Sequence, residues 1–340
     1  MDKALLEKTA RAMVAKGKGL LAADESAGTC EKRFKLVNVA CSEESRRAYR
    51  ELLFTTPGAA EFVSGVILYD ETLRQKTKDG VPFAEYMVKN GIIPGIKVDT
   101  GAKALALSPG EQVTEGLDGL RERLAEYFQL GARFAKWRAV INIGAGIPTV
   151  GCIEANAQAL ARYSALCQEA NIVPIVEPEV LLDGDHSIER CYEVTEATLR
   201  TLFNTLAEQK VSLEHVILKA SMVLSGNKAA SRTGVQEVGE QTLKCLKRTV
   251  PAALPGVVFL SGGQNDEEAT AHLDAMNRIG GAPWPLTYSY SRALQAAALK
   301  AWSGQQANWN AAQAAFYHRA KMNSLASQGK WSRELEKKAA

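Results

Sequence analysis

The chain has 340 residues, with 41 lysines and arginines against 38 aspartates and glutamates, which gives a formal net charge of +3. Hydrophobic residues make up 46% and charged residues 23%, a composition typical of globular proteins that excludes a disordered chain, a collagen and a coiled coil. This charge balance disfavours nucleic acid as a partner, and no apolar run approaches the roughly 18 residues of a membrane span.

Residues 1–18 are predicted to form a leading amphipathic helix. They carry acidic residues and no long apolar stretch, so they do not resemble a secretory signal, and a cytoplasmic protein is expected. The six cysteines form no C-x-x-C pair and the four histidines lie far apart, so no metal site is predicted. Scattered cysteines of this kind are typical of reduced thiols in the cytoplasm.

Eight short apolar runs follow in chain order, and each ends in a polar or charged cluster. Interpreted as strands, they are residues 19–24, 62–70, 92–99, 134–141, 172–179, 215–221, 256–263 and 286–292. The longer segments between them have helical periodicity. The later strands are evenly spaced, since Lys136 and Glu177 are 41 residues apart (177 − 136) and Glu177 and Lys219 are 42 apart (219 − 177).

Strands that alternate with helices predict parallel βαβ units, and eight of them predict a closed (β/α)₈ TIM barrel in the α/β class. No linker-like segment interrupts the series, so residues 1–340 are expected to form one domain. Further helices are predicted at 305–330 and a mobile tail at 331–340. The alternative is a doubly wound open sheet, which should begin with G-x-G-x-x-G; the first strand instead ends in Asp24-Glu25-Ser26.

Charged residues gather where the predicted strands end, which is where TIM barrels place their active sites. Three pairs of charged residues are each two positions apart, so both members of a pair face the same side of a strand. The pairs are Lys97 with Asp99, Lys136 with Arg138, and Glu177 with Glu179. A single pair is as often a structural ion pair as a functional one. Three pairs together with Asp24, Lys219 and Arg292 indicate a barrel mouth that holds both signs of charge.

Lys219 follows the apolar run HVIL inside a predicted strand. Burial there, with cationic Lys136 nearby, would favour the neutral amine, which can attack a carbonyl to form an imine. The structural alternative is a lysine paired with a neighbouring glutamate. Glu177 and Glu179 are expected to crowd each other, which would raise one pKa and make a proton shuttle, and Asp24 beside two lysines is expected to stay ionised.

Two groups of residues are candidates for binding anions. Ser261, Gly262 and Gly263 follow the seventh strand, and Ser289 and Arg292 flank the end of the eighth, where these barrels often hold phosphate. A second anion could bind on the opposite side, where the candidates are Ser26, Arg33, Arg46 and Lys97. An imine-forming lysine between two anion sites predicts carbon–carbon bond chemistry on a phosphorylated ketose. The protonated imine would replace a metal as the electron sink.

Several segments resemble class I fructose-1,6-bisphosphate aldolases, in order from about residue 5 to residue 330. They include LAADES, GIKVD, FAKWR, ARYSALCQEANIVPIVEPE, ILKASM, FLSGGQ and SYSRALQ. The resemblance implies a TIM barrel that cleaves fructose 1,6-bisphosphate reversibly into dihydroxyacetone phosphate and glyceraldehyde 3-phosphate. It further implies no metal or other cofactor and a homotetramer.

The resemblance also assigns roles. It implies that Lys219 forms the Schiff base, that Glu177 is the general acid/base, and that Asp24 acts on the C4 hydroxyl, with Glu179 and Lys136 as further catalytic positions. The C1 phosphate would bind Ser261, Gly262, Gly263, Ser289 and Arg292. The other phosphate or the substrate chain would contact Lys97, Arg33, Arg46, Ser26 and Arg138.

The sequence departs from the animal enzymes of this family at three points. Those enzymes end in a mobile tail with a final tyrosine, whereas this chain ends in Glu-Lys-Lys-Ala-Ala, so its preference for a bisphosphate is open. Ser291 stands where they have glycine, and Ala220 where they have proline. Two other functions are open at this stage: another lysine-dependent aldolase acting on a sugar monophosphate or sedoheptulose bisphosphate, or an aldolase-like scaffold protein.

Overall fold

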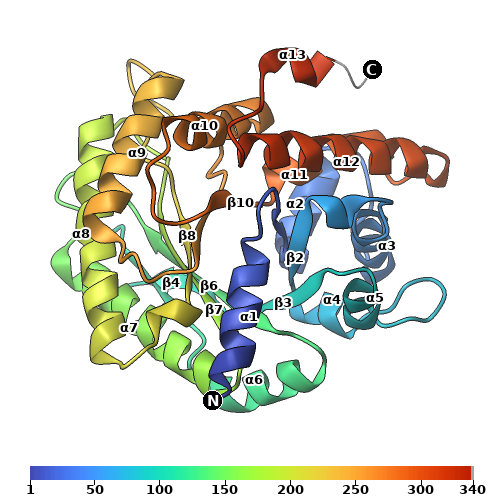
Figure 1. The fold of residues 1–340 in the computed structure, drawn as a ribbon, viewed down its shortest axis with the longest axis horizontal. Helices are drawn as coiled ribbons and strands as arrows, with labels where there is room; N and C mark the ends of the chain where they lie inside the picture. The colour runs from blue at the N-terminus through green and yellow to red at the C-terminus, as the bar shows by residue number, and fades with distance from the viewer. Residues whose placement is uncertain (338–340) are drawn as a thin grey trace.

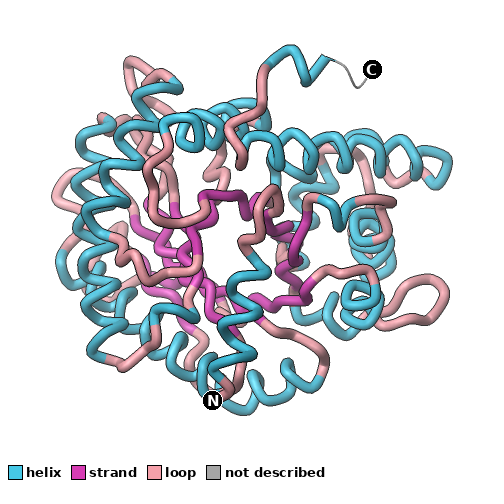
Figure 2. The backbone as a smooth tube through the Cα atoms, viewed as in Figure 1, coloured by secondary structure: helices cyan, strands magenta, loops and turns pink. Residues whose placement is uncertain are grey.

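In the computed structural model, which describes residues 1–337, eight parallel strands close into a barrel (Figures 1 and 2). They pair in the order β1-β10-β9-β8-β7-β6-β3-β2, and the last strand pairs with the first. The strands are β1 (Gly19–Ala23), β2 (Val63–Leu68), β3 (Ile93–Lys97), β6 (Phe134–Ile141), β7 (Val173–Val180), β8 (Ile217–Ala220), β9 (Gly256–Phe259) and β10 (Leu286–Tyr290). The predicted (β/α)₈ barrel is confirmed, and the doubly wound alternative is wrong because an open sheet would have two unpaired edges.

Helices surround the barrel, and Figure 2 shows them as an outer layer around the strands. Their apolar faces pack against the strands to form the main core. The helices are α1 (Lys3–Met13), α2 (Ala27–Lys35), α3 (Glu43–Phe54), α4 (Asp70–Arg74), α5 (Phe83–Lys89), α6 (Leu120–Gln129), α7 (Val150–Glu169), α8 (Ile188–Glu208), α9 (Val235–Thr249), α10 (Asp266–Ile279), α11 (Arg292–Trp302), α12 (Trp309–Ala326) and α13 (Arg333–Glu336). Among residues 1–337, no helix is both long and apolar enough to cross a bilayer.

The leading helix α1 covers the barrel at the end where the strands begin. Its buried residues Leu6 and Met13 join the cluster of apolar side chains inside the barrel. The hydroxyl of Ser64, near the start of β2, donates a hydrogen bond to the carbonyl of Met13 at 2.6 Å. Because α1 closes this end, the opposite end of the barrel is the one left for a site.

A two-stranded hairpin that the sequence analysis did not predict follows β3. It consists of β4 (Gly101–Ala104) and β5 (Gln112–Glu115), which pair in antiparallel fashion outside the barrel. Pro109 and Gly110 lie in the connection, and Gly110 has a φ of +80°, a conformation that glycine adopts without strain. Its strands GAKA and QVTE have four residues each, and only Thr114 among them is buried, which is why they carry no hydrophobic alternation.

The C-terminal helices predicted at 305–330 correspond to α12, and the chain beyond them packs on the barrel. Trp331 is buried, and its backbone N–H donates to Asp274 at 2.8 Å. The carboxylate of Glu336 in α13 pairs with Arg319 at 2.7 Å. Residues 338–340 of the predicted mobile tail lie outside the described residues.

Gly95 in β3 provides a test of the packing inside the barrel. A Cβ atom at this position would overlap the buried ring of Phe134 on the neighbouring strand. We therefore expect Gly95→Ala to lower the free energy of unfolding by about 1–3 kcal/mol, as overpacked cores do. The matched control is Gly28→Ala in α2, where no atom lies within 4 Å of the added Cβ. Urea unfolding of both variants makes the comparison, and equal stabilities would contradict this packing.

Candidate active site

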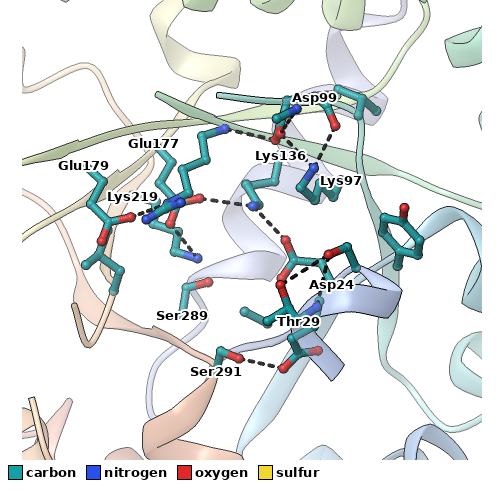
Figure 3. A pocket seen from close by; sticks show the side chains of 18 of the residues that line it. Asp24, Thr29, Lys97, Asp99, Lys136, Glu177, Glu179, Lys219, Ser289 and Ser291 are labelled. Atoms are coloured by element: carbon teal, nitrogen blue, oxygen red, sulfur yellow. Dashed lines mark hydrogen bonds and ion pairs between the residues drawn. The ribbon is translucent and has the colours of Figure 1, made fainter. Parts of the chain in front are cut away.

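A cavity of about 590 Å³ opens at the carboxyl ends of the barrel strands (Figure 3). Each of the eight barrel strands, or the residues that directly follow it, contributes to its lining. Strongly charged side chains dominate the lining, and they are among the residues that the sequence analysis singled out: Asp24, Lys97, Lys136, Arg138, Glu177, Glu179 and Lys219. The predicted gathering of charge at the strand ends is therefore present in the structure.

The period of two along β6 and β7 explains how these side chains reach the cavity. Lys136 and Arg138 both face inward from β6, and Glu177 and Glu179 both face inward from β7. In the parallel pairing of these strands Arg138 stands beside Glu177. The register therefore interleaves cations and carboxylates across neighbouring strands.

Four buried side chains form a row of alternating charge at the centre of the cavity. The Lys219 Nζ lies 3.0 Å from Oε1 of Glu177, and the Lys136 Nζ lies 3.3 Å from its Oε2. Lys136 also contacts Oδ2 of Asp24 at 2.7 Å. None of the four side chains is more than 11% exposed. Two ammonium groups and two carboxylates thus neutralise one another where water has little access.

These neighbours shift the pKa values of the row in definite directions. Burial alone would raise the pKa of Asp24, but the ammonium groups of Lys136 and Lys219 outweigh it and lower the pKa well below its usual value. Burial alone would lower the pKa of Lys136, but Asp24 and Glu177 outweigh it and raise the pKa. The expectation that Asp24 stays ionised agrees with these directions.

The expected crowding of Glu177 by Glu179 is wrong. The pKa of Glu177 is lowered, because Lys219, Lys136 and Arg138 together outweigh the effect of burial. Glu179 pairs instead with the guanidinium of Arg138. Lys136 lies near Lys219, as expected, since the two ammonium groups contact the two oxygens of the same Glu177 carboxylate. Glu177 and Glu179 thus pair with different cations, because Lys219 reaches Glu177 from β8 and Arg138 reaches Glu179 from β6.

The loop after β9 turns at two consecutive glycines. Gly262 and Gly263 adopt φ values of +56° and +92°, which favour glycine, and Ser261 and Gly262 line the cavity. Ser289 at the end of β10 is buried and also lines the cavity, and among residues 1–337 its hydroxyl has no hydrogen-bond partner. Arg292, the first residue of α11, completes this side.

The opposite side of the cavity is built around the first turn of α2. Ser26 caps this helix by accepting a hydrogen bond from the backbone N–H of Thr29, and the two hydroxyls lie 3.2 Å apart. Ser26, Thr29, Arg33 and Lys97 all line the cavity. Hydroxyls and cations at a helix N-terminus suit a phosphate.

One predicted anion ligand lies elsewhere. The guanidinium of Arg46 forms a two-point pair with the carboxylate of Glu71, at 2.6 and 2.8 Å, and it is not among the residues that line the cavity. Gly263 is likewise not among the lining residues, although it belongs to the same turn. Arg46 resembled a site residue in the sequence because the partner that holds it lies 25 residues further along the chain.

Several lining residues were not chosen as site residues from the sequence, and Thr29, Tyr69, Asp99, Glu25 and Ser291 are among them. Thr29 lies three residues after the helix cap Ser26, a spacing that could have marked it as a neighbour of that hydroxyl. Tyr69 follows β2 and carries no comparable signal. Asp99 accepts from the Lys97 ammonium at 2.7 Å and from the backbone N–H of Arg138 at 3.2 Å, so it holds β3 and β6 together.

Comparisons with known proteins agree with one another. The family model described as "Fructose-bisphosphate aldolase class-I" matches residues 5–340. A protein from Xanthomonas campestris named "Probable fructose-bisphosphate aldolase class 1" is 65% identical over 327 residues, which cover 96% of this chain and 98% of the relative. The Arabidopsis thaliana protein "Fructose-bisphosphate aldolase 4, cytosolic" is 53% identical over 314 residues, which cover 92% of this chain and 80% of the relative.

A solved structure shows the same architecture. Fructose-bisphosphate aldolase from Plasmodium falciparum, determined in complex with TRAP and a small-molecule inhibitor, superimposes with a TM-score of 0.96 and 49% sequence identity. The match covers 97% of this chain and 95% of that chain.

Lys136 is the residue on which the charges of the row depend most, because it contacts both carboxylates. We expect Lys136→Met to lower the free energy of unfolding by about 3–5 kcal/mol at pH 7, since it leaves two buried carboxylates short of a cation. Carboxylates with lowered pKa values contribute stability above their unfolded pKa of about 4, and this contribution is lost as the pH falls through the folded pKa. The difference in the free energy of unfolding between Lys136→Met and the wild type should therefore become smaller as the pH falls below about 4.

Thermal unfolding of both proteins between pH 3 and pH 7 provides the measurement. Lys103→Met, which removes an exposed lysine from β4, is the matched control and should leave the midpoint nearly unchanged. A difference that stays constant or widens at acid pH would show that Lys136 does not hold these carboxylates ionised.

Proposed function

Because the chain belongs to the class I fructose-bisphosphate aldolase family, we propose that Lys219 is its Schiff-base lysine and that the row of charges around it carries the proton transfers. Members of this class cleave fructose 1,6-bisphosphate through a lysine imine and without a metal. The observation that carries the proposal is the contact of Lys219 with Glu177 inside the cavity, at 3.0 Å. A buried amine beside a carboxylate has a proton acceptor in reach before it attacks a carbonyl carbon.

Glu177 is the general acid/base of imine formation. It accepts a proton from the Lys219 ammonium, and the freed lone pair attacks the C2 carbonyl of the open-chain sugar. Glu177 returns this proton to the C2 oxygen to give the carbinolamine, and then transfers a second proton from the nitrogen to the same oxygen. The oxygen leaves as water, and the protonated imine keeps the one remaining N–H. The proposal is supported by the position of Glu177 between two ammonium groups, because Lys136 stabilises the carboxylate whenever it is ionised.

Asp24 is the base that starts carbon–carbon cleavage. Its lowered pKa keeps it ionised, so it can accept the proton of the C4 hydroxyl. As the C4 oxygen forms a carbonyl, the C3–C4 bond breaks and its electron pair moves into the protonated imine, which becomes an enamine. Glyceraldehyde 3-phosphate leaves, C3 is protonated, and water releases dihydroxyacetone phosphate from Lys219. Arg138 and Glu179 form an ion pair that lines the same cavity as these catalytic groups.

The two phosphates bind on opposite sides of the cavity. The C1 phosphate contacts Ser261, Gly262, Ser289 and Arg292, and the other phosphate contacts Ser26, Arg33 and Lys97. Two observations support the C1-phosphate site: the Ser289 hydroxyl has no hydrogen-bond partner among residues 1–337, and the glycine turn has positive φ values. The N-terminus of α2 supports the site of the other phosphate. Arg46 contributes to phosphate binding only indirectly, through its ion pair with Glu71. Gly263 contributes by adopting the positive φ that the turn after β9 requires.

We further propose that residues 1–340 act as one domain, that the protein is a cytoplasmic homotetramer, and that phosphorylated sugars rather than nucleic acid or membrane are its partners. The location is supported by relatives from Arabidopsis thaliana and Spinacia oleracea whose names describe them as cytosolic and cytoplasmic.

Reduction with borohydride in the presence of dihydroxyacetone phosphate tests the function directly. The hydride reduces the imine to a stable secondary amine, so we expect loss of activity and a mass increase on the peptide that contains Lys219. Lys219→Met should show neither the adduct nor cleavage activity. An adduct on another lysine, or no adduct, would contradict the proposal.

A chelation control separates this mechanism from a metal-dependent one. Incubation with EDTA should leave the rate of fructose 1,6-bisphosphate cleavage unchanged, because the protonated imine is the electron sink.

Glu177→Gln tests the proton transfers separately from binding. It keeps the shape of the side chain and removes its ability to accept a proton, so we expect kcat to fall by about 10²–10⁴-fold. Substrate KM should change much less than kcat. The matched variant is Glu179→Gln, which alters a carboxylate that pairs with Arg138 rather than with Lys219. Rapid-quench measurement of the rate of imine formation compares the two variants. An equal decrease of this rate in both would contradict the assignment of Glu177 as the general acid/base.

A further inference from the structure

The turn that joins β10 to α11 is connected to the opposite side of the cavity by one hydroxyl. The Ser291 hydroxyl donates a hydrogen bond to Oε1 of Glu25 at 2.8 Å and accepts one from Nη1 of Arg33 at 2.9 Å. Figure 3 shows Ser291 below Ser289, with a dashed line to the neighbouring carboxylate. Ser291 follows β10, whereas Glu25 and Arg33 follow β1, so this contact joins segments that are 258 or more residues apart.

The carboxylate that Ser291 contacts is firmly held. Oε2 of Glu25 accepts from Arg50 at 2.8 Å, and Arg50 is buried and also donates to the carbonyl of Ala23. Burial alone would raise the pKa of Glu25, but Arg50 and Arg33 outweigh it and lower the pKa. Because Arg50 fixes one oxygen of Glu25, the other oxygen, Oε1, is held in place for the hydrogen bond from Ser291.

Arg33 is the member of this cluster that lines the cavity and is partly exposed. Its Nη1 serves both Glu25 and Ser291, so the hydrogen bonds that hold Arg33 use one end of the guanidinium. Among residues 1–337, the Nη2 group and the Nε–H of Arg33 have no hydrogen-bond partner, so they are left for a ligand in the cavity that Arg33 lines. Glu25, Arg33 and Arg50 together carry one excess positive charge (2 − 1), which suits an anion. The direction in which Arg33 points is therefore set by Glu25 and Ser291 together.

We propose that Ser291 is a positioning residue that determines the preference for a bisphosphate substrate, by holding Arg33 at the second phosphate site. Arg292, the neighbour of Ser291, lines the same cavity on the side of the first phosphate site. The Ser291 hydroxyl thus ties the two anion-binding sides together at a definite spacing. The inference rests on the two-phosphate arrangement proposed above.

The role predicts a selective effect of removing the hydroxyl. Ser291→Ala keeps the backbone N–H of the turn and removes the contacts to Glu25 and Arg33, together with the longer hydrogen bond that Nε2 of Gln295 donates to the hydroxyl at 3.3 Å. We expect the ratio of kcat/KM for fructose 1,6-bisphosphate to kcat/KM for fructose 1-phosphate to fall about tenfold, the typical effect of losing a hydrogen bond to a charged group. The change should appear in KM for the bisphosphate rather than in kcat, because the reacting centre is untouched.

A double-mutant cycle shows whether Ser291 acts through Arg33. In the Arg33→Ala background, Ser291→Ala should cause no further change in the ratio, since the group that it positions is gone. Additive losses would overturn the proposal. The same ratio for Ser291→Ala and the wild type, or equal losses for both substrates, would overturn it as well.

Two further variants serve as controls in case Ser291→Ala does not fold or has an unspecific effect. Ser291→Gly also lacks the hydroxyl and should reproduce the change in the ratio if Ser291→Ala does not fold. Ser303→Ala removes an exposed hydroxyl at the other end of the same helix, which donates to the Lys300 carbonyl, and should leave the ratio unchanged. The wild-type borohydride reaction distinguishes the two failures. The absence of an adduct at Lys219 would contradict the proposed function. An adduct at Lys219, together with an unchanged ratio of the two kcat/KM values in Ser291→Ala, would contradict only the role of Ser291.

Discussion

The row of alternating charges from Lys219 through Glu177 and Lys136 to Asp24 is the constraint on which the rest of the site depends. Four ionised groups in so little water would be costly without close partners of opposite sign, because a buried charge keeps its ionised form only when it is paired. Here each inner member of the row touches two opposite charges, at 2.7–3.3 Å. The arrangement keeps Asp24 and Glu177 as carboxylates and Lys136 as a cation, which are the forms that the proposed proton transfers need.

The barrel makes this row possible because neighbouring parallel strands present their ends to one another. The pairing of β6 with β7 places Arg138 beside Glu177, so the signs alternate around the cavity without any loop having to position them. The residues of the row lie on or directly after strands, whereas most of the proposed phosphate-binding residues lie on the turns and helices that follow the strands. The proposed proton transfers therefore take place at the strand ends, and the proposed phosphate-binding residues surround them. The Ser291 hydroxyl contacts residues from two sides of this cavity.

Much of this architecture could be predicted from the amino-acid sequence, because strand and helix periodicities are local. All eight barrel strands were found in this way, and Lys219 was recognisable as a charged residue inside an apolar strand. The hairpin β4–β5 was missed because it is exposed and lacks alternation. The pairing of Glu177 was misjudged for a different reason. Its sequence neighbour is Glu179, but its spatial neighbours come from β6 and β8, and only the register between strands determines which cations reach it. Arg46 shows the same limit, since the contact with Glu71 that holds it away from the cavity joins two separate helices.

The most direct test of this account is the titration of Glu177 itself. In protein labelled with ¹³C at the glutamate carboxyl carbons, the signal of Glu177 can be assigned by its absence in Glu177→Gln. If Lys219 and Lys136 hold the carboxylate ionised, this signal should keep the chemical shift of the charged form as the pH falls through 4.5, the ordinary value for a glutamate. A signal that titrates at or above that value would show that burial outweighs the two lysines, and the row of charges would not have the role described here.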